Sequence, residues 1–404
     1  MKRLLYLGMA FPPGVAGHFP ELQPAGHVIE TAMIDAVRPW FEVKSVGISE
    51  LQLDRLNLPP DGSVGLPHEL NLLDRPPEIF HRLASLARLK QAYRAWVRAG
   101  WRPDVIVVCN FVPVYSAFTR WLRRQRDVPP LVLYLADSMG LGQKVPWLKR
   151  FRYRFKPLAY PDDEMAGYYD ACVSTSRTTG QFITPRGLPW LWLPNGCDAR
   201  RALRPGPGDG EGPVSFGFFG SLSPHTGLPA LLKIFLARNG RNPLRVCGFG
   251  KIRHELEASC RGRSEISFCG PMKPDECLRF AQDCDVMVNP RPLCPGNDNN
   301  FSSKVFEYAL TGRAILTSRV SGVDEILGAD AFYFDENDFE HSLTGALGAV
   351  AGAPRAELRR RGAALQQRML EEFSWARQGR RLAEFLEEAI RRGQELRQSA
   401  AAKN

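Results

Sequence analysis

The chain has 404 residues, of which 44% are hydrophobic and 24% are charged, and its formal net charge is +10. This length and apolar content suffice for two globular domains with cores of their own, which argues against intrinsic disorder. The excess of positive charge indicates an acidic partner. A nucleotide, an anionic lipid surface and a nucleic acid all fit that description, and charge alone does not choose among them.

The opening residues, MKRLLYLGMAF, have the cationic start and the short apolar run of a secretory signal. The run is brief and leads into FPPGVAG, which favours a first β-strand that feeds a glycine loop. No uninterrupted apolar stretch reaches the roughly 20 residues needed to cross a bilayer. We therefore expect a soluble or peripheral protein of the cytoplasm.

Cysteine usage points to the same compartment. The chain has nine cysteines, an odd number, and none forms a Cys-x-x-Cys pair. Cysteines inside apolar runs behave as small buried apolar residues, so we expect free thiols in a reducing cytosol. The cysteines in or beside such runs are Cys109, Cys172, Cys247, Cys269 and Cys284.

Short apolar runs alternate with amphipathic stretches, which is typical of parallel sheets flanked by helices. Two series of strands are predicted, and the segment 204–213, RPGPGDGEGP, separates them as a linker because glycine and proline disfavour helix and strand. The first series is 3–7, 41–46, 105–109, 131–135 and 171–174, and the second is 215–219, 244–247, 266–269, 286–289 and 314–317.

The predicted fold is therefore α/β, with two Rossmann-like parallel-sheet domains that face each other across a cleft. The domains are expected at 1–203 and 214–375. After Pro354, apolar residues recur at helical spacing and predict two long helices. We expect the second of them, 376–404, to pack back on the N-terminal domain.

Ligands of open parallel sheets bind beyond the carboxyl ends of the strands, so these positions are the first candidates. Gly14 and Gly17 follow the first strand, where glycine lets the backbone approach a ligand closely, although an ordinary turn is an equal alternative. The loop lacks Gly-x-Gly-x-x-Gly, so a nicotinamide or flavin cofactor is not indicated. Asp137 follows another strand and could orient a substrate hydroxyl or cap a helix.

Two more strand ends lie in the second series. Gly220 and Ser221 precede a helix, and exposed amides at such a loop bind phosphate, although a tight turn needs the same residues. Lys251 follows a further glycine-rich loop, CGFGK, that could lie along a nucleotide base.

The segment 289–318, NPRPLCPGNDNNFSSKVFEYALTGRAILTS, is the most informative. Arg291 follows a strand, and Ser303 leads into a helix that places Lys304 and Glu307 three residues apart on one face. Lys304 could donate to phosphate oxygens, and Glu307, one turn further, could accept from vicinal hydroxyls. A nucleoside diphosphate offers both groups, while a surface ion pair between the two residues is the alternative.

The pieces NPR, FSSK, FEY and TGRAILTS resemble the donor-binding region of family 4 glycosyltransferases of the GT-B fold, particularly bacterial polysaccharide enzymes. The resemblance extends over most of the second domain and in the first domain rests on the glycine loop, YYDACVSTS and LWLPNGCD. It implies a nucleotide-sugar donor and an acceptor, a glycan or a polyprenyl-linked sugar, held by the first domain. It also implies retention of anomeric configuration, Glu307 on the ribose and amides near Gly220 on the diphosphate, with no cofactor and no metal.

The sequence departs from the family pattern in several places. Asn299 stands where many members have the first of two glutamates, and Ser221 and Thr226 stand where many have Arg and Lys. Neutralising the diphosphate would then fall to Arg291, Lys304 or Lys251. No residue clearly matches the histidine that many members place near the reacting carbon, which leaves His18 and Asp137 as the catalytic candidates.

Asp283 and Asp285 form an Asp-x-Asp pair, which in another glycosyltransferase fold holds a divalent metal. The second aspartate leads into an apolar run, so we interpret the pair as carboxylates at a helix end and a strand start.

Three stretches of the first domain combine cationic and aromatic residues: LARLKQAYRAWVRAGWR, RWLRRQR and KVPWLKRFRYRFKP. Such segments suit an anionic membrane surface, here the inner face of the plasma membrane, where a polyprenyl-linked acceptor would be reached. A solvated helix face is the commonest fate of charged stretches in general, and nucleic-acid binding is the least favoured alternative; we slightly favour membrane association here.

Two other functions remain open at this point. A sugar-nucleotide epimerase shares the two-domain architecture, and a non-catalytic nucleotide-sugar or membrane-binding protein would explain the departures at Asn299, Ser221 and Thr226.

Overall fold

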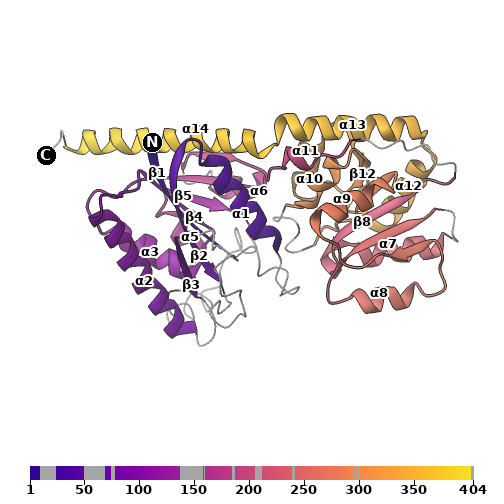
Figure 1. The fold of residues 1–404 in the computed structure, drawn as a ribbon, viewed down its shortest axis with the longest axis horizontal. Helices are drawn as coiled ribbons and strands as arrows, with labels where there is room; N and C mark the ends of the chain where they lie inside the picture. Colours follow the sequence, from indigo (N-terminus) through magenta and orange to yellow (C-terminus); the bar gives the residue numbers. More distant parts are fainter. Residues whose placement is uncertain are drawn as a thin grey trace, which may run out of the picture. The chain divides into compact units, whose positions relative to one another are not determined.

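The computed structural model describes residues 1–9, 24–49, 69–73, 78–136, 158, 160–183, 187–204, 212–238, 242–294, 297 and 301–401. The chain divides into two compact units (Figure 1). Unit 1 comprises Met1–Pro194 and Gln378–Asn404, and unit 2 comprises Asn195–Arg377. Each unit contains one parallel sheet with helices around it.

Unit 1 is built on a seven-stranded sheet of order β3-β2-β1-β4-β5-β6-β7, in which every described pairing is parallel. Its central strands, β4 and β5, are buried along their whole length, because apolar residues face helices on both sides. The strands are β1 (Lys2–Met9), β2 (Phe41–Ser49), β3 (Leu70–Leu73), β4 (Val105–Cys109), β5 (Leu131–Leu135), β6 (Ala171–Ser174) and β7 (Trp190–Trp192). The helices are α1 (Pro24–Val37), α2 (Glu78–Arg98), α3 (Pro113–Leu122), α5 (Asp162–Ala166) and α6 (Arg177–Ile183).

Unit 2 is built on a six-stranded parallel sheet of order β10-β9-β8-β11-β12-β13. The strands are β8 (Phe216–Ser221), β9 (Leu244–Phe249), β10 (Ile266–Phe268), β11 (Val286–Asn289), β12 (Ala314–Thr317) and β13 (Phe332–Tyr333). The helices are α7 (Leu228–Ala237), α8 (Arg253–Ser259), α9 (Pro274–Gln282), α10 (Lys304–Leu310), α11 (Val323–Leu327), α12 (Phe339–Ala351) and α13 (Arg355–Glu372), and short 3-10 turns lie at Ala199–Arg201, Pro224–Thr226, Val320–Gly322 and Gly328–Asp330.

The last helix, α14 (Trp375–Ala401), returns the chain to unit 1. Gln378 Nε2 donates to the Pro194 carbonyl at 3.0 Å, and Lys2 Nζ lies 3.0 Å from a Glu387 carboxylate oxygen. Gly379 packs so closely that a Cβ there would lie 2.2 Å from the carbonyl oxygen of Ala36. Only glycine allows this approach of helix to backbone.

The fold class is the predicted one, and all ten predicted strands are present. Three short strands, β3, β7 and β13, were not predicted. Each lies at a sheet edge and is at most four residues long, and β7 and β13 consist of partly exposed residues, so these segments lack the long apolar runs of the central strands.

The division between the units falls after Pro194 and not at 204–213. The reason is that residues 195–203 bond within unit 2: Cys197 N donates to the Phe373 carbonyl at 2.9 Å, and Leu203 N donates to the Leu310 carbonyl at 3.0 Å. None of the helices in the described ranges combines the length and apolar character that a membrane span requires.

Candidate donor site

The candidate site lies where β8 ends and α10 begins, at the carboxyl edge of the sheet of unit 2. Lys304 is the first residue of α10, and its side chain lies against Gly220 near the end of β8. A Cβ at position 220 would meet Cδ of Lys304 at 2.9 Å and Nζ at 3.2 Å, and Gly220 also has a φ of +139°. The backbone conformation therefore requires glycine there, and a Cβ at this position would displace the Lys304 side chain.

The ammonium of Lys304 has no acidic partner among the residues that the structure describes. Its Nζ lies 4.4 Å from the centroid of the Phe218 ring, and no carboxylate of the described residues forms an ion pair with it. Burial, and then repulsion by Arg291, lower the pKa of Lys304 to about 7. Two cations brought together in a poorly hydrated place are the electrostatic arrangement that an incoming phosphate stabilises.

Glu307 lies one turn further along α10 and pairs with Arg201 instead of Lys304. Its carboxylate oxygen is 3.4 Å from Nη1 of Arg201, whose Nε is 3.0 Å from Asp275. Burial raises the pKa of Glu307 and Arg201 opposes that rise, while 41% of the side-chain surface remains accessible. The alternative of a Lys304–Glu307 surface ion pair is therefore not what the structure shows.

Tyr308 fixes α10 to the end of β8. Its hydroxyl accepts from the Phe219 amide at 3.2 Å and donates to the Phe219 carbonyl at 2.9 Å, and the two rings lie 4.6 Å apart. The tyrosine is completely buried. The position of Lys304 relative to Gly220 is thus set by paired hydrogen bonds and by core packing.

The segment after β11 is held by a buried polar network. Asn289 Nδ2 donates to Thr317 at 3.0 Å, and Ser302 donates to the Asn289 side-chain oxygen at 3.3 Å. Asn297 Nδ2 donates to the carbonyls of His225 and Pro292, each at 2.9 Å. These bonds position residues 289–292 beside the helix that begins with Lys304.

Other predicted donor-site residues have different surroundings. Ser303 directly precedes α10, and Ser221 ends β8. Thr226 is buried and donates to the Ser223 carbonyl at 2.7 Å, which is a turn contact. Lys251 is exposed in the turn before α8, and within the described residues no hydrogen bond or ion pair joins it to the others. Gly14, Gly17, His18, Asp137 and Asn299 lie outside the described residues.

Two functional candidates escaped prediction. Arg201 is 106 residues from Glu307 in sequence, and its buried Nη2 has no hydrogen-bond partner within the described part of the chain. In unit 1, the buried carboxylate of Glu30 accepts from the Met9 amide at 2.8 Å and from the Cys109 thiol at 3.1 Å, at the carboxyl ends of β1 and β4. The sequence did offer a signal for Glu30, which is a glutamate within the apolar run HVIETAMI. It offered no signal that Arg201 would contribute to the site.

The Asp-x-Asp pair is structural. Asp283 pairs with Arg245 at 2.6 Å, and Asp285 pairs with Arg355 and accepts from the Ser215 amide at 2.8 Å. Among the residues that the structure describes, no group of acidic, histidine and cysteine side chains is arranged to hold a metal ion.

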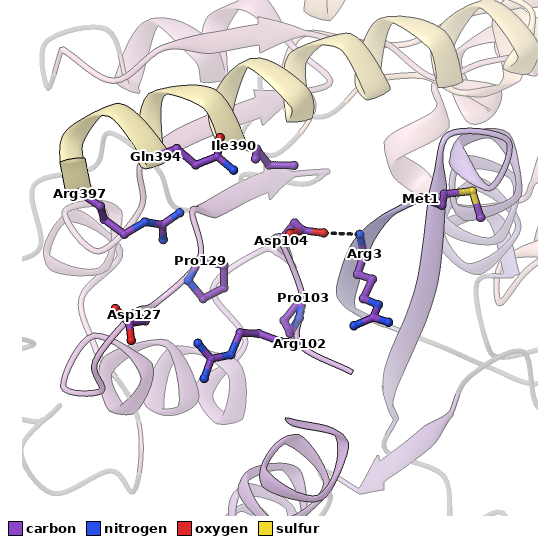
Figure 2. A pocket seen from close by; sticks show the side chains of 10 residues that line it. All are labelled: Met1, Arg3, Arg102, Pro103, Asp104, Asp127, Pro129, Ile390, Gln394 and Arg397. Carbon is purple, nitrogen blue, oxygen red and sulfur yellow. Dashed lines mark hydrogen bonds between the residues drawn. The ribbon is translucent and has the colours of Figure 1, made fainter. Parts of the chain in front are cut away.

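A cavity of about 510 Å³ lies in unit 1, at the amino ends of its strands (Figure 2). Its residues lie at the start of β1, precede β4 and β5, or come from α14, and they include both arginines and aspartates. Two of the arginines already have partners: Arg3 pairs with Glu42 at 3.1 Å, and Arg397 donates to the Val128 carbonyl at 3.0 Å. This is the amino edge of a parallel sheet, where substrates do not usually bind. The lining residues are Met1, Arg3, Arg102, Pro103, Asp104, Asp127, Pro129, Ile390, Gln394 and Arg397.

Comparison with known proteins finds a family match within unit 2. Residues 213–351 match the family model described as glycosyl transferases group 1. The chain carries a group 1 glycosyltransferase domain. The match contains β8, α10 and the segment between them, and with the fold it identifies the chain as a glycosyltransferase. Comparison with the curated proteins gives no match.

Solved structures share the whole architecture at low identity. Anabaena HepE in complex with UDP has a TM-score of 0.68 and 15% identity, over 96% of this chain and 100% of that chain. The lipopolysaccharide outer core galactosyltransferase WaaB has a TM-score of 0.64 and 12% identity, over 95% of this chain and 99% of that chain. Sucrose-phosphate synthase from Thermosynechococcus elongatus has a TM-score of 0.64 and 15% identity, over 99% of this chain and 100% of that chain. At these identities the likeness shows the GT-B fold.

Proposed function

We propose that this glycosyltransferase moves a sugar from a nucleoside diphosphate sugar, with UDP as the nucleotide, to a hydroxyl of a glycan or lipid-linked acceptor in cell-surface polysaccharide synthesis. The observation that carries the proposal is Lys304, an ammonium without an acidic partner among the described residues, set beside Arg291 and the end of β8. Neighbours of the same fold support the choice of donor, since HepE is described with UDP and with UDP and glucose.

In the proposed complex, Lys304 and Arg291 stabilise the charge that develops on the diphosphate as it leaves. Preorganised charges aimed at such a leaving group are usually the largest catalytic contribution. Glu307 accepts from the ribose hydroxyls, and its pairing with Arg201 opposes the rise in the Glu307 pKa that burial causes. The transfer retains anomeric configuration, as in the family that the motifs resemble, and uses no metal or cofactor.

We also propose that the protein is cytoplasmic and binds the anionic inner face of the plasma membrane through unit 1. Three apolar side chains near the start of α2, Ile79, Phe80 and Leu83, are 45%, 71% and 48% exposed. Basic residues follow on the same helix, where Lys90 and Arg94 lie over the Trp121 ring at 5.6 and 5.2 Å. Exposed apolar residues beside cations suit an anionic lipid surface better than nucleic acid.

The function is tested by replacing Glu307. A thermal-shift screen against nucleoside diphosphates and sugar nucleotides first identifies the donor, because a ligand that binds the folded state raises its Tm. Glu307→Ala is then expected to lower transfer by at least about 100-fold, since charge-assisted hydrogen bonds contribute roughly 1.5–3 kcal/mol each. Glu340→Ala, which breaks a surface ion pair with Lys233, is the matched control and keeps full activity.

Product analysis separates the alternatives. Transfer requires an acceptor, whereas an epimerase converts the sugar nucleotide without one, and a non-catalytic protein binds the nucleotide and leaves it intact. Full transfer activity in Glu307→Ala would overturn the site assignment.

A further inference from the structure

Two cysteines of unit 2 lie in direct contact beside the candidate site. All nine cysteines belong to the described residues and all are free thiols. Sγ of Cys247, in β9, lies 3.8 Å from Sγ of Cys277, in α9, and no other two sulfurs of these nine form such a contact. The two residues belong to different elements, so a bond between them would join the sheet to the helix.

The helix that carries Cys277 also holds Arg201. Asp275, two positions before Cys277, accepts from Nε of Arg201 at 3.0 Å, and Arg201 reaches Glu307 at 3.4 Å. The charges of Glu307 and Arg201 act on the Cys277 thiol directly. A movement of α9 would therefore shift Arg201, and through Arg201 it would affect the carboxylate of Glu307 in the candidate site.

The two thiols are chemically unequal. Cys277 is partly exposed, while Cys247 is buried. The contact between them lowers the pKa of Cys277 and raises the pKa of Cys247, and burial adds to the rise for Cys247. Accessible thiolates react with oxidants, so Cys277 is the nucleophile and Cys247 the resolving thiol.

We propose that peroxide joins Cys247 and Cys277 in a reversible disulfide, and that this disulfide weakens nucleotide binding at the adjacent site. The Cys277 thiolate attacks one oxygen of hydrogen peroxide, the O–O bond breaks, and the departing hydroxide takes a proton to become water. The Cys247 thiol then attacks the resulting sulfenic sulfur, the S–O bond breaks, and the hydroxide leaves with the Cys247 proton as a second water. The two thiols lose two electrons, which peroxide accepts.

Closing the bond requires movement. A disulfide has a sulfur–sulfur distance of about 2.05 Å, so the sulfurs must approach from 3.8 Å by nearly half that separation. We expect α9 to provide part of this movement, because Cys247 lies in β9, which is held in the sheet between β8 and β10. Asp275 moves with α9 and shifts Arg201, to which it is hydrogen-bonded. This shift alters the contact between Arg201 and Glu307. This second part of the proposal rests on the proposed function of the site.

The bond is tested by mass spectrometry on the full-length protein. After titration with hydrogen peroxide and alkylation of the remaining thiols, we expect a loss of two hydrogens, a cross-linked peptide pair containing Cys247 and Cys277, and reversal by dithiothreitol. Cys277→Ser and Cys247→Ala each abolish the cross-link. Cys269→Ser is the matched control: its amide donates to the Val246 carbonyl at 2.8 Å beside Cys247, and it keeps the cross-link. A cross-link to Cys269, or none at all in the wild-type protein, overturns the proposal.

The effect on binding is measured by titrating UDP into reduced and oxidised protein. We expect the oxidised wild type to bind about tenfold more weakly or worse, and Cys277→Ser to bind equally before and after peroxide. Equal UDP affinity of the two wild-type forms, with the disulfide present, overturns the regulatory part. Failure of the reduced protein to bind any nucleotide contradicts the proposed function, and the cross-link then still decides whether the disulfide forms.

Discussion

Gly220 and Lys304 depend on each other more closely than their separation in sequence suggests. The glycine has a φ that side chains rarely adopt, and the space where its Cβ would stand is filled by the lysine. Both residues could be nominated from the sequence because each belongs to a strand-end motif. Their contact and the pairing of Glu307 with Arg201 could not be predicted, because Arg201 comes from a short turn far away in the chain.

Replacing Gly220 tests the contact. Gly220→Ala is expected to displace Lys304 and to weaken UDP binding by at least about tenfold, a loss of roughly 1.4 kcal/mol. Gly262→Ala is the control, because Gly262 has a φ of +79° but no atom within 4 Å of the place that a Cβ would take. Both variants lose about 1 kcal/mol of stability from the backbone conformation. Equal UDP affinities in calorimetric titration would show that the side-chain space at Gly220 does not matter.

The lowered pKa of Lys304 makes folding depend on pH. Its pKa is about 7 in the folded protein against an ordinary value of 10.5, so between those values the unfolded chain binds a proton that the folded protein lacks. This group therefore makes stability rise with pH across that window. Lys304→Met removes the slope, and it raises Tm at pH 7 by roughly 2–4 °C for each kcal/mol gained.

The same lysine links nucleotide binding to protons. A bound diphosphate favours the ammonium, so UDP binding takes up a proton above about pH 7, and affinity falls by as much as roughly tenfold per pH unit there. Calorimetry in buffers of different ionisation enthalpy measures the uptake. Lys304→Met should bind UDP weakly at every pH; an unchanged pH profile in that variant would assign the titration to another group.

At the scale of elements, prediction succeeded where burial is complete. The strands β4, β5, β6, β11 and β12 have the predicted bounds because every residue in them is buried, which leaves a continuous apolar run in the sequence. The strand β7, WLW, is only three partly exposed residues long, and β13 has two. Such strands are defined by their pairing with a neighbouring strand, and their own residues carry no pattern from which they could be predicted.

The junction of α10 with β8 should be sensitive to a single oxygen atom. Tyr308→Phe removes both hydrogen bonds to Phe219, and the loss of two buried bonds is expected to cost about 1–3 kcal/mol and to weaken UDP binding. Tyr333→Phe removes one bond, to the Gly328 carbonyl at 2.7 Å, and is the control. Denaturant unfolding gives the free energies; a Tyr308→Phe protein with unaltered stability and affinity would mean that other contacts hold α10.

At the scale of the whole molecule, the net charge of +10 acts together with the exposed start of α2. We expect the protein to sediment with anionic liposomes at low salt, to be released as salt screens the charges, and to ignore neutral liposomes. Phe80→Ser should weaken the binding by several-fold. Leu396→Ser, at an equally exposed residue of α14, is the matched control and leaves it unchanged. Indifference of the wild-type protein to anionic liposomes would remove the membrane proposal.

The path of the chain through α14 has a consequence for biosynthesis. Residues 378–401 belong to unit 1 but leave the ribosome after the whole of unit 2. Domains generally fold as units while the chain is being made, and here the N-terminal one lacks a helix of its own core until translation has passed residue 377. Unit 2, although it is encoded later, is the first whose residues are all available, so the two units complete their folding in the reverse of their order in the gene.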